Sequence, residues 1–235
     1  YEKDNTQLNV LPKGEGDHLN VDDAIRMMGT DGILNVDVSK LYDTKIIKEN
    51  NIRFPENIST GEDLVFNCNY LSYINKVAVV SKSNYYYMRR EIESLVNKYR
   101  DDTFEISIYL LDKVKQLYNS LDMNLEIDVV NLSNYYCDYM VSCVSNLYRR
   151  SSRLNAKKRR EKLSEIFEYT KKTDIRKTNR NNKFCLIFLF LYTRNVYWSE
   201  KLYSLLFWFR NTFSKFYVLY RNKVVFTSEK NDENK

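Results

Sequence analysis

Two adjacent carboxylates, Glu62 and Asp63, have the types and spacing best suited to acid–base chemistry in this chain of 235 residues. They follow Gly61, where a loop is expected to become a helix. Backbone N–H groups at a helix N-terminus stabilise negative charge, so we expect at least one of the two carboxylates to be ionised and available as a base or a ligand. Leu64 and Phe66 would anchor this helix to a hydrophobic core. The simpler alternative is that the acidic pair only stabilises the start of the helix.

The elements around this pair follow a mixed α/β pattern. Residues 1–18 are polar and are expected to form a loop, and residues 33–38 an extended segment. Apolar spacing and turn residues predict helices over about 20–28, 43–50 and 62–74, and short strands over 77–80 and 85–88.

From residue 102 onward, apolar residues recur at three- and four-residue spacing, which is typical of amphipathic helices. We expect helices over about 102–120, 125–149, 155–171, 183–194 and 198–220. The predicted fold class is therefore an α/β part over residues 1–100 followed by an all-helical part over residues 101–235, in a chain that is predominantly helical overall.

Composition excludes several classes of protein. A chain that is 43% hydrophobic, with 5 Gly and 2 Pro, is neither collagen-like nor of low complexity, and its aromatic content argues against intrinsic disorder. The 4 cysteines form no C-x-x-C pair, which favours buried free thiols over a disulfide framework or a zinc site. With His18 as its one histidine, the chain offers little for Ser-His-Asp or Cys-His catalysis.

Four segments in order resemble bacterial family 2 glycosyltransferases of the GT-A fold, the type that builds capsular polysaccharide, exopolysaccharide and teichoic-acid-like polymers. They are Val38-Ser39-Lys40-Leu41-Tyr42, Asn51-Ile52-Arg53-Phe54-Pro55, Gly61-Glu62-Asp63-Leu64-Val65-Phe66-Asn67, and Tyr85-Tyr86-Tyr87-Met88-Arg89-Arg90 with Ser94-Leu95. Two positions depart from the family pattern, since Ser39 replaces the usual Asn and Val38 a bulky residue, so we expect the local acceptor wall to differ from that of the family.

The resemblance implies an inverting transfer of a sugar from a nucleotide-sugar donor to a sugar acceptor. Asp63 matches the aspartate that deprotonates the acceptor hydroxyl, and Glu62 would orient the acceptor or cap the helix. Lys40 would meet donor phosphate or line the acceptor cleft, and Arg90 would offset charge on the departing diphosphate. For Lys40 and Arg90, a surface or structural cation remains an equal alternative.

The family also implies a divalent metal ion, Mg²⁺ or Mn²⁺, held by an Asp-x-Asp motif upstream of the matching region. No Asp-x-Asp occurs in this chain, and Glu15-Gly16-Asp17 is the nearest imitation. We therefore expect this chain to correspond to the C-terminal part of such an enzyme, without the nucleotide-binding half, and to be inactive alone.

Charge is divided unevenly along the chain. Residues 1–148 hold 15 basic and 23 acidic residues, whereas residues 149–235 hold 22 basic and 8 acidic residues. Basic residues beside Trp- and Phe-rich helices suit contact with the cytoplasmic face of a membrane, where a lipid-linked acceptor would sit. A solvated helical bundle or a homodimer is the alternative, and nucleic acid is disfavoured because no recognised motif accompanies the charge. A non-catalytic module that docks on a membrane or a protein is the competing function.

Overall fold

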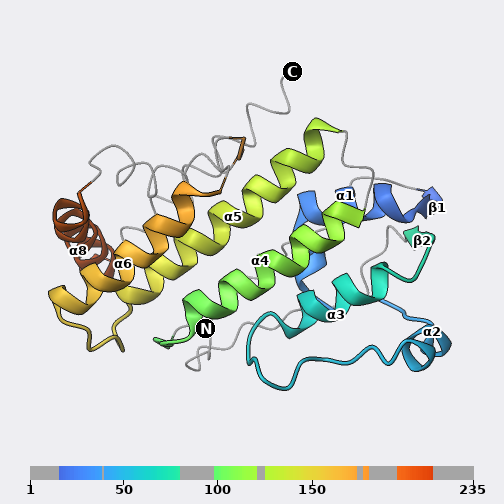
Figure 1. The fold of residues 1–235 in the computed structure, drawn as a ribbon, viewed down its shortest axis with the longest axis horizontal. Coiled ribbons are helices and arrows are strands. Elements are labelled where there is room, and N and C mark those ends of the chain that lie inside the picture. Colours follow the sequence, from blue (N-terminus) through green and yellow to red (C-terminus); the bar gives the residue numbers. More distant parts are fainter. Residues whose placement is uncertain are drawn as a thin grey trace, which may run out of the picture.

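The computed structural model describes residues 16–38, 40–79, 98–120, 125–173, 177–179 and 195–213. Its centre is a row of three long helices, α4 (Thr103–Ser120), α5 (Glu126–Leu147) and α6 (Ala156–Lys171), in which α5 packs between the other two (Figure 1). At one end of the row, α8 (Val196–Thr212) packs on α6, and at the other end α1 (Val21–Asp31) and α3 (Glu62–Leu71) pack on α5 and α4. Among these helices, none is both long and apolar enough to cross a bilayer.

A two-stranded antiparallel sheet lies beside α1. Strand β1 (Gly16–Asn20) pairs with β2 (Lys76–Val79), with Leu19 opposite Val77 and an irregularity between Gly16 and Leu19. The strand expected over 77–80 is thus confirmed, whereas the loop expected over 1–18 is wrong for its last residues. Leu19 and Val77 both pack on the core, and this contact favours a strand in an otherwise polar segment. The strand expected over 85–88 lies outside the described residues.

Helix α1 begins within one residue of its predicted start and runs three residues past its predicted end, to Asp31. The Asn20 side-chain oxygen accepts a hydrogen bond from the Asp23 backbone N–H at 2.8 Å, and Gly32 ends the helix with φ +73°. Arg26 fastens α1 to α5, because its guanidinium donates to both carboxylate oxygens of the fully buried Asp128, at 2.9 and 3.3 Å.

The segment after α1 differs from its prediction. A 3₁₀ turn spans Ile33–Asn35 where an extended segment was expected, because the left-handed Gly32 turns the chain and buries Leu34 completely. The following helix α2 (Thr44–Glu49) is confirmed, with the Asp43 carboxylate as its N-cap.

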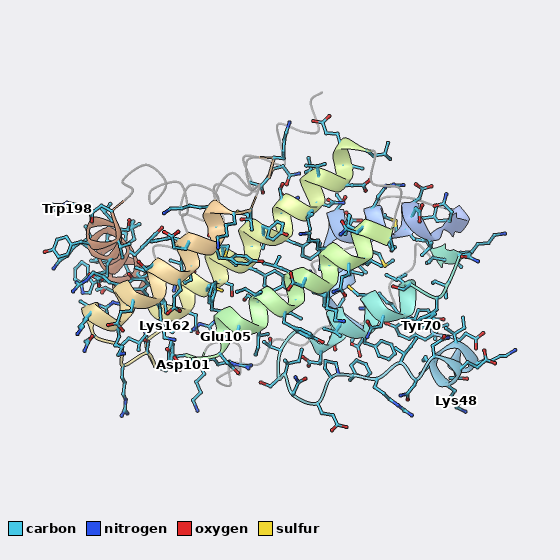
Figure 2. All side chains as sticks on the ribbon, in the orientation of Figure 1. Lys48, Tyr70, Asp101, Glu105, Lys162 and Trp198 are labelled. Atoms are coloured by element: carbon cyan, nitrogen blue, oxygen red, sulfur yellow. The ribbon has the colours of Figure 1, made fainter. Side chains whose placement is uncertain are left out.

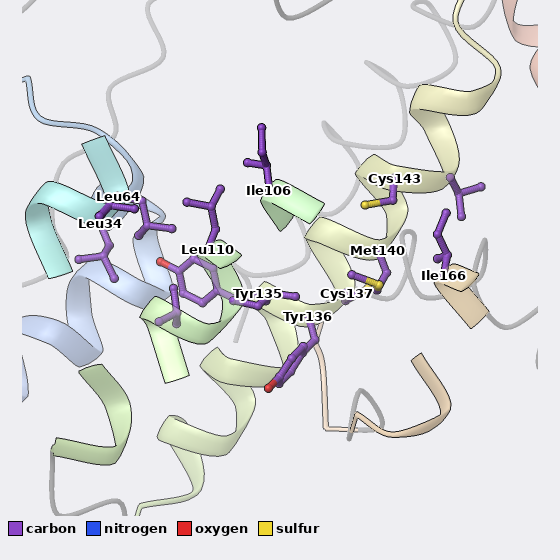
Figure 3. Close-up of a cluster of buried hydrophobic side chains, with 14 of the residues drawn as sticks. Leu34, Leu64, Ile106, Leu110, Tyr135, Tyr136, Cys137, Met140, Cys143 and Ile166 are labelled. Carbon is purple, nitrogen blue, oxygen red and sulfur yellow. The ribbon is translucent and has the colours of Figure 1, made fainter. Parts of the chain in front are cut away.

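One hydrophobic core continues from the first hundred residues into the helical part. Figure 3 shows Leu34 and Leu64 close to Leu110 and Tyr135, with the cluster continuing along α5 to Ile166 of α6. Side chains from both parts share this core, so the core marks no boundary at residue 100. The division there stays a prediction. Cys68, Cys137 and Cys143 are buried free thiols, as expected, and Cys185 lies outside the described residues.

The predicted fold class is confirmed, since the described chain is predominantly helical with a small α/β part. The predicted boundaries of α4, α5 and α6 agree with the structure to within one or two residues. Helix α8 begins two residues before its prediction and ends at Thr212, and the helix expected over 183–194 lies outside the described residues.

Candidate active site

The candidate site is built on the first turn of α3. Gly61 precedes this turn with φ +81°, a conformation that L side chains rarely adopt. A Cβ at Gly61 would also lie 2.3 Å from Leu110 Cδ1, so the glycine permits close contact between the loop and α4. Glu62 and Asp63 follow in the first turn, and both are half-buried.

Asn67, one turn further along α3, holds the loop before α2 against the site. Its amide nitrogen donates to the carbonyl oxygens of Leu34 and Val36, each at 2.9 Å. Its amide oxygen accepts a hydrogen bond from the Tyr42 hydroxyl at 2.6 Å. Asn67 is buried, so these three hydrogen bonds fix residues 34–36 and Tyr42 beside the start of α3.

Aromatic packing on the same face of α3 adds contacts to Tyr42 and brings one further segment to the site. The Tyr42 ring meets Phe66 and Tyr70 edge to face, with centroids 5.2 and 5.0 Å apart. Phe54 stacks on Phe66 at 4.3 Å, and the Tyr70 hydroxyl accepts a hydrogen bond from the Asp43 backbone N–H at 2.8 Å.

The structure therefore brings together three of the four segments that carry the family resemblance. The segments at 38–42, 51–55 and 61–67 meet through the contacts of Asn67 and Phe66. The fourth segment, with Arg90, lies outside the described residues.

The electrostatic environment of Asp63 differs from the one its helix position predicted. Burial raises the pKa of the Asp63 carboxyl, and the negative charges of Asp37 and Glu62 raise it further. A hydrogen bond from the Asp37 backbone N–H lowers this pKa without reversing the shift. Desolvation and like charges thus outweigh the start of the helix, and a carboxylate with a raised pKa is the stronger base.

Asp37 is a site residue that sequence reasoning missed. It lies in the loop held by Asn67, and its carboxyl group interacts with that of Asp63. Its spacing from Asp63 in the sequence carries no signal of this contact.

Lys40 lies within electrostatic reach of both aspartates. Its ammonium group donates to the carbonyl oxygens of Ile33, at 2.8 Å, and Val36. Burial lowers the pKa of Lys40 to about 8, although Asp37 and Asp63 oppose this shift. The hydrogen bonds support a structural role in the loop, and the nearby carboxylates support a role in the site.

Glu62 has one buried carboxylate oxygen, Oε2, without a hydrogen-bond partner among the described residues. The N-cap residue of α3 is Gly61, which has no side chain to cap the helix. A buried oxygen without a partner is costly, so this side chain is suited to accept a hydrogen bond from a ligand.

A groove of about 360 Å³ begins at Gly61 and runs between α4 and α5. Tyr135 and Tyr139 contribute aromatic rings to its wall, with Leu64, Ile106 and Leu110 as apolar neighbours. Its polar lining consists of Asn35, Thr60, Thr103, Ser107, Asp138 and Ser142. Sequence reasoning missed this groove, although Tyr135, Asp138, Tyr139 and Ser142 have the three- and four-residue spacing of one helix face.

The described residues do not form a metal centre. In the parts of the chain that the structure describes, no three or more His, Cys, Asp or Glu side chains are arranged so that they could hold a metal ion. Asp37, Glu62 and Asp63 therefore do not fit as a ligand set for the divalent ion that the family resemblance implies.

Burial raises the pKa of the Cys68 thiol to about 12 and that of Cys143 to about 11, which makes both thiols unreactive.

Comparison with known proteins shows a weak similarity to a bacterial enzyme. The chain is 32% identical over 77 residues to the poly(ribitol-phosphate) beta-N-acetylglucosaminyltransferase TarS of Staphylococcus aureus, in strains Mu50 / ATCC 700699 and MW2. The match covers 32% of this chain and 13% of each relative. No family model matches the chain, and no solved structure does. The chain thus has a distant, partial similarity to a glycosyltransferase.

Proposed function

We propose that this chain carries the acceptor side of an inverting glycosyltransferase of the GT-A type, in which Asp63 is the general base. The observation that carries the proposal is the environment of Asp63, a half-buried carboxyl group whose pKa is raised by burial and by Asp37 and Glu62. The partial similarity to TarS supports the same class of reaction.

In the proposed reaction, an acceptor hydroxyl attacks the anomeric carbon of a nucleotide sugar. The carboxylate of Asp63 takes the hydroxyl proton as the new C–O bond forms, and the bond to the diphosphate breaks on the opposite face of the sugar. The nucleoside diphosphate leaves with the electron pair, so the anomeric configuration inverts. No step is assigned to a metal ion, because the described residues offer no site for one.

The groove between α4 and α5 suits a hydroxyl-rich acceptor, either a sugar or a polyol. Tyrosine rings can pack on the apolar faces of a sugar, while the hydroxyl, amide and carboxylate groups of the lining can bind its hydroxyls. The groove begins at Gly61, directly before Glu62 and Asp63. In this proposal Glu62 orients the acceptor, Lys40 binds donor phosphate or the acceptor, and Arg90 offsets the charge of the diphosphate.

The proposal is tested by sugar transfer from nucleotide sugars, with Mg²⁺ or Mn²⁺ present, by the protein made from its whole reading frame. The Asp63→Asn variant should lose about 10²-fold to 10⁴-fold in turnover, the usual contribution of a general base. The control is Asp43→Asn, which makes the same change at the exposed N-cap of α2 and should leave turnover unchanged.

A measurement of stability separates lost chemistry from lost folding. Because the folded state penalises the ionised form of Asp63, Asp63→Asn should be at least as stable as wild type at pH 7. Equal turnover in wild type and Asp63→Asn would refute the role of Asp63. Absence of turnover in wild type with every common donor would refute the glycosyltransferase function and favour the competing docking module.

A further inference from the structure

Helix α8 exposes several large apolar residues to solvent, while two polar and two aromatic residues face the protein. Ser199, Glu200, Tyr203 and Phe207 are buried against α6 and its surroundings. On the opposite side, the exposed fractions are 59% for Trp198, 61% for Leu205, 58% for Trp208 and 53% for Phe209. Figure 2 shows Trp198 at the outer edge of the molecule.

The inward side of α8 is fixed by a buried ion pair. The Arg159 guanidinium of α6 donates to Glu200 Oε1 at 2.9 and 2.8 Å, and the Ser204 hydroxyl donates to the same oxygen at 2.8 Å. Phe207 stacks on Tyr148 with ring centroids 4.9 Å apart. Because a half turn of α8 would break this pair and leave the partly buried Arg159 without its carboxylate, the outward position of the tryptophans is built into the fold.

Basic side chains surround the exposed face. Arg160 lies over the Tyr197 ring at 5.5 Å near the start of α8, and Lys201 lies over the same ring at 5.7 Å. Near the end of α8, Arg150 donates to the Asn211 carbonyl at 2.5 Å. Residues 149–160 contain 7 basic residues and no acidic one, and Glu200, the single acidic residue of α8, is buried in its ion pair.

We propose that the outer face of α8, formed by Tyr197, Trp198, Leu205, Leu206, Trp208 and Phe209, docks in the interface of a bilayer that contains anionic phospholipid. Tryptophan and tyrosine prefer the headgroup level, and the leucines and Phe209 can enter the acyl region below it. The basic rim matches the negative charge of such a surface. In this arrangement α8 lies in the plane of the bilayer surface, and α6 packs on the side of α8 that faces away from the bilayer. The proposal does not rest on the glycosyltransferase function.

The chain contains 2 tryptophans, and both lie on this face, so intrinsic fluorescence reports on it directly. Wild-type protein is titrated with vesicles of phosphatidylcholine, with and without phosphatidylglycerol, and with acyl chains brominated for quenching. Tryptophan emission should shift to the blue and be quenched with the anionic vesicles, less so with phosphatidylcholine alone, and less at high salt.

Two variants keep both tryptophans and separate the apolar and the charged contribution. Leu205→Ser with Leu206→Ser should weaken vesicle binding by about tenfold or more. The matched control, Ile127→Ser with Val129→Ser, makes the same kind of change at exposed positions of α5 and should leave binding unchanged. Arg160→Gln with Lys201→Gln, both beside the Tyr197 ring, should weaken binding to anionic vesicles and leave the weak binding to phosphatidylcholine unchanged.

Three results would overturn the proposal. Blue-shifted emission in the monomer without vesicles would mean that another segment of this chain covers α8. A blue shift that grows with protein concentration, together with a dimer in light scattering, would assign the face to a second copy. Unchanged emission with all vesicles would exclude the lipid surface.

Discussion

Asn67 offers the sharpest test of how the candidate site is assembled. Replacing it by alanine removes three hydrogen bonds, those to the Leu34 and Val36 carbonyls and that from the Tyr42 hydroxyl. At a net 0.5–1.5 kcal/mol each, Asn67→Ala should lower the free energy of unfolding by about 1.5–4.5 kcal/mol. Tyr42→Phe removes one of the three and should cost about 1 kcal/mol.

The Asn67→Asp variant tests the two hydrogen bonds donated by the amide nitrogen through a change of charge. It keeps an acceptor for Tyr42 but replaces the amide donor by an oxygen that faces two carbonyl oxygens at 2.9 Å. The ionised form is disfavoured there, so the pKa of the new carboxyl would be raised in the folded state. The stability of this variant should therefore fall as pH rises through that pKa, and at pH 7 it should be no more stable than Asn67→Ala.

Urea unfolding followed by circular dichroism measures these differences. The control is Asn69→Ala, on the same helix and half-buried, which should change the free energy of unfolding by less than about 0.5 kcal/mol. If Asn67→Ala is as stable as this control, or if Asn67→Asp is as stable as wild type at pH 7, Asn67 does not hold the loop that carries Asp37 and Lys40.

Three further predictions concern the same site. Gly61→Ala should lower stability by at least about 1 kcal/mol in urea unfolding, since φ is +81° and the new Cβ would press on Leu110; wild-type stability would refute the close contact. Asp37→Asn should move the acid limb of the pH profile of kcat/KM to lower pH, because Asp37 raises the pKa of Asp63; an unmoved limb would show that the two carboxyls are not coupled. The pKa of Lys40 is about 8 in the folded state and 10.5 in the unfolded state, so between these values the folded protein binds fewer protons. The free energy of unfolding of wild type should therefore rise with pH over this window relative to that of Lys40→Met. The same pH dependence in both proteins would contradict the lowered pKa.

Local signals in the sequence were sufficient for much of the scaffold. Apolar periodicity predicted α4, α5 and α6, and apolar spacing with turn residues predicted the starts of α1 and α2 to within one residue. Strand β1 was not predictable in this way, because its pairing with β2 joins residues far apart in the chain, and Leu19 gains its partner only in the folded state.

The site was predictable in part for the same reason. Gly61, Glu62 and Asp63 are contiguous, so their pattern is visible in the sequence. The placement of Asp37 depends on Asn67, whose hydrogen bonds reach Leu34 and Val36 across more than thirty residues. The raised pKa of Asp63 follows from that tertiary contact and from burial, neither of which a helix start indicates.

The orientation of α8 shows a second limit of pattern reasoning. Its sequence is apolar around most of the helix, so periodicity alone does not tell which side faces the protein. The ion pair between Arg159 and Glu200 decides the orientation, and it joins two helices rather than two neighbouring residues.

The close approach of Gly61 to Leu110 has a consequence for how such proteins diversify. The turn that carries Glu62 and Asp63 rests directly on α4, and Leu64 and Leu110 belong to one core (Figure 3). Recombination at residue 100 would have to preserve both the turn at Gly61 and the surface of α4 that this turn contacts. We therefore expect the acidic turn and α4 to be inherited together. Under the proposed function, acceptor preference would then change through the α4–α5 face without any change to the acidic turn itself.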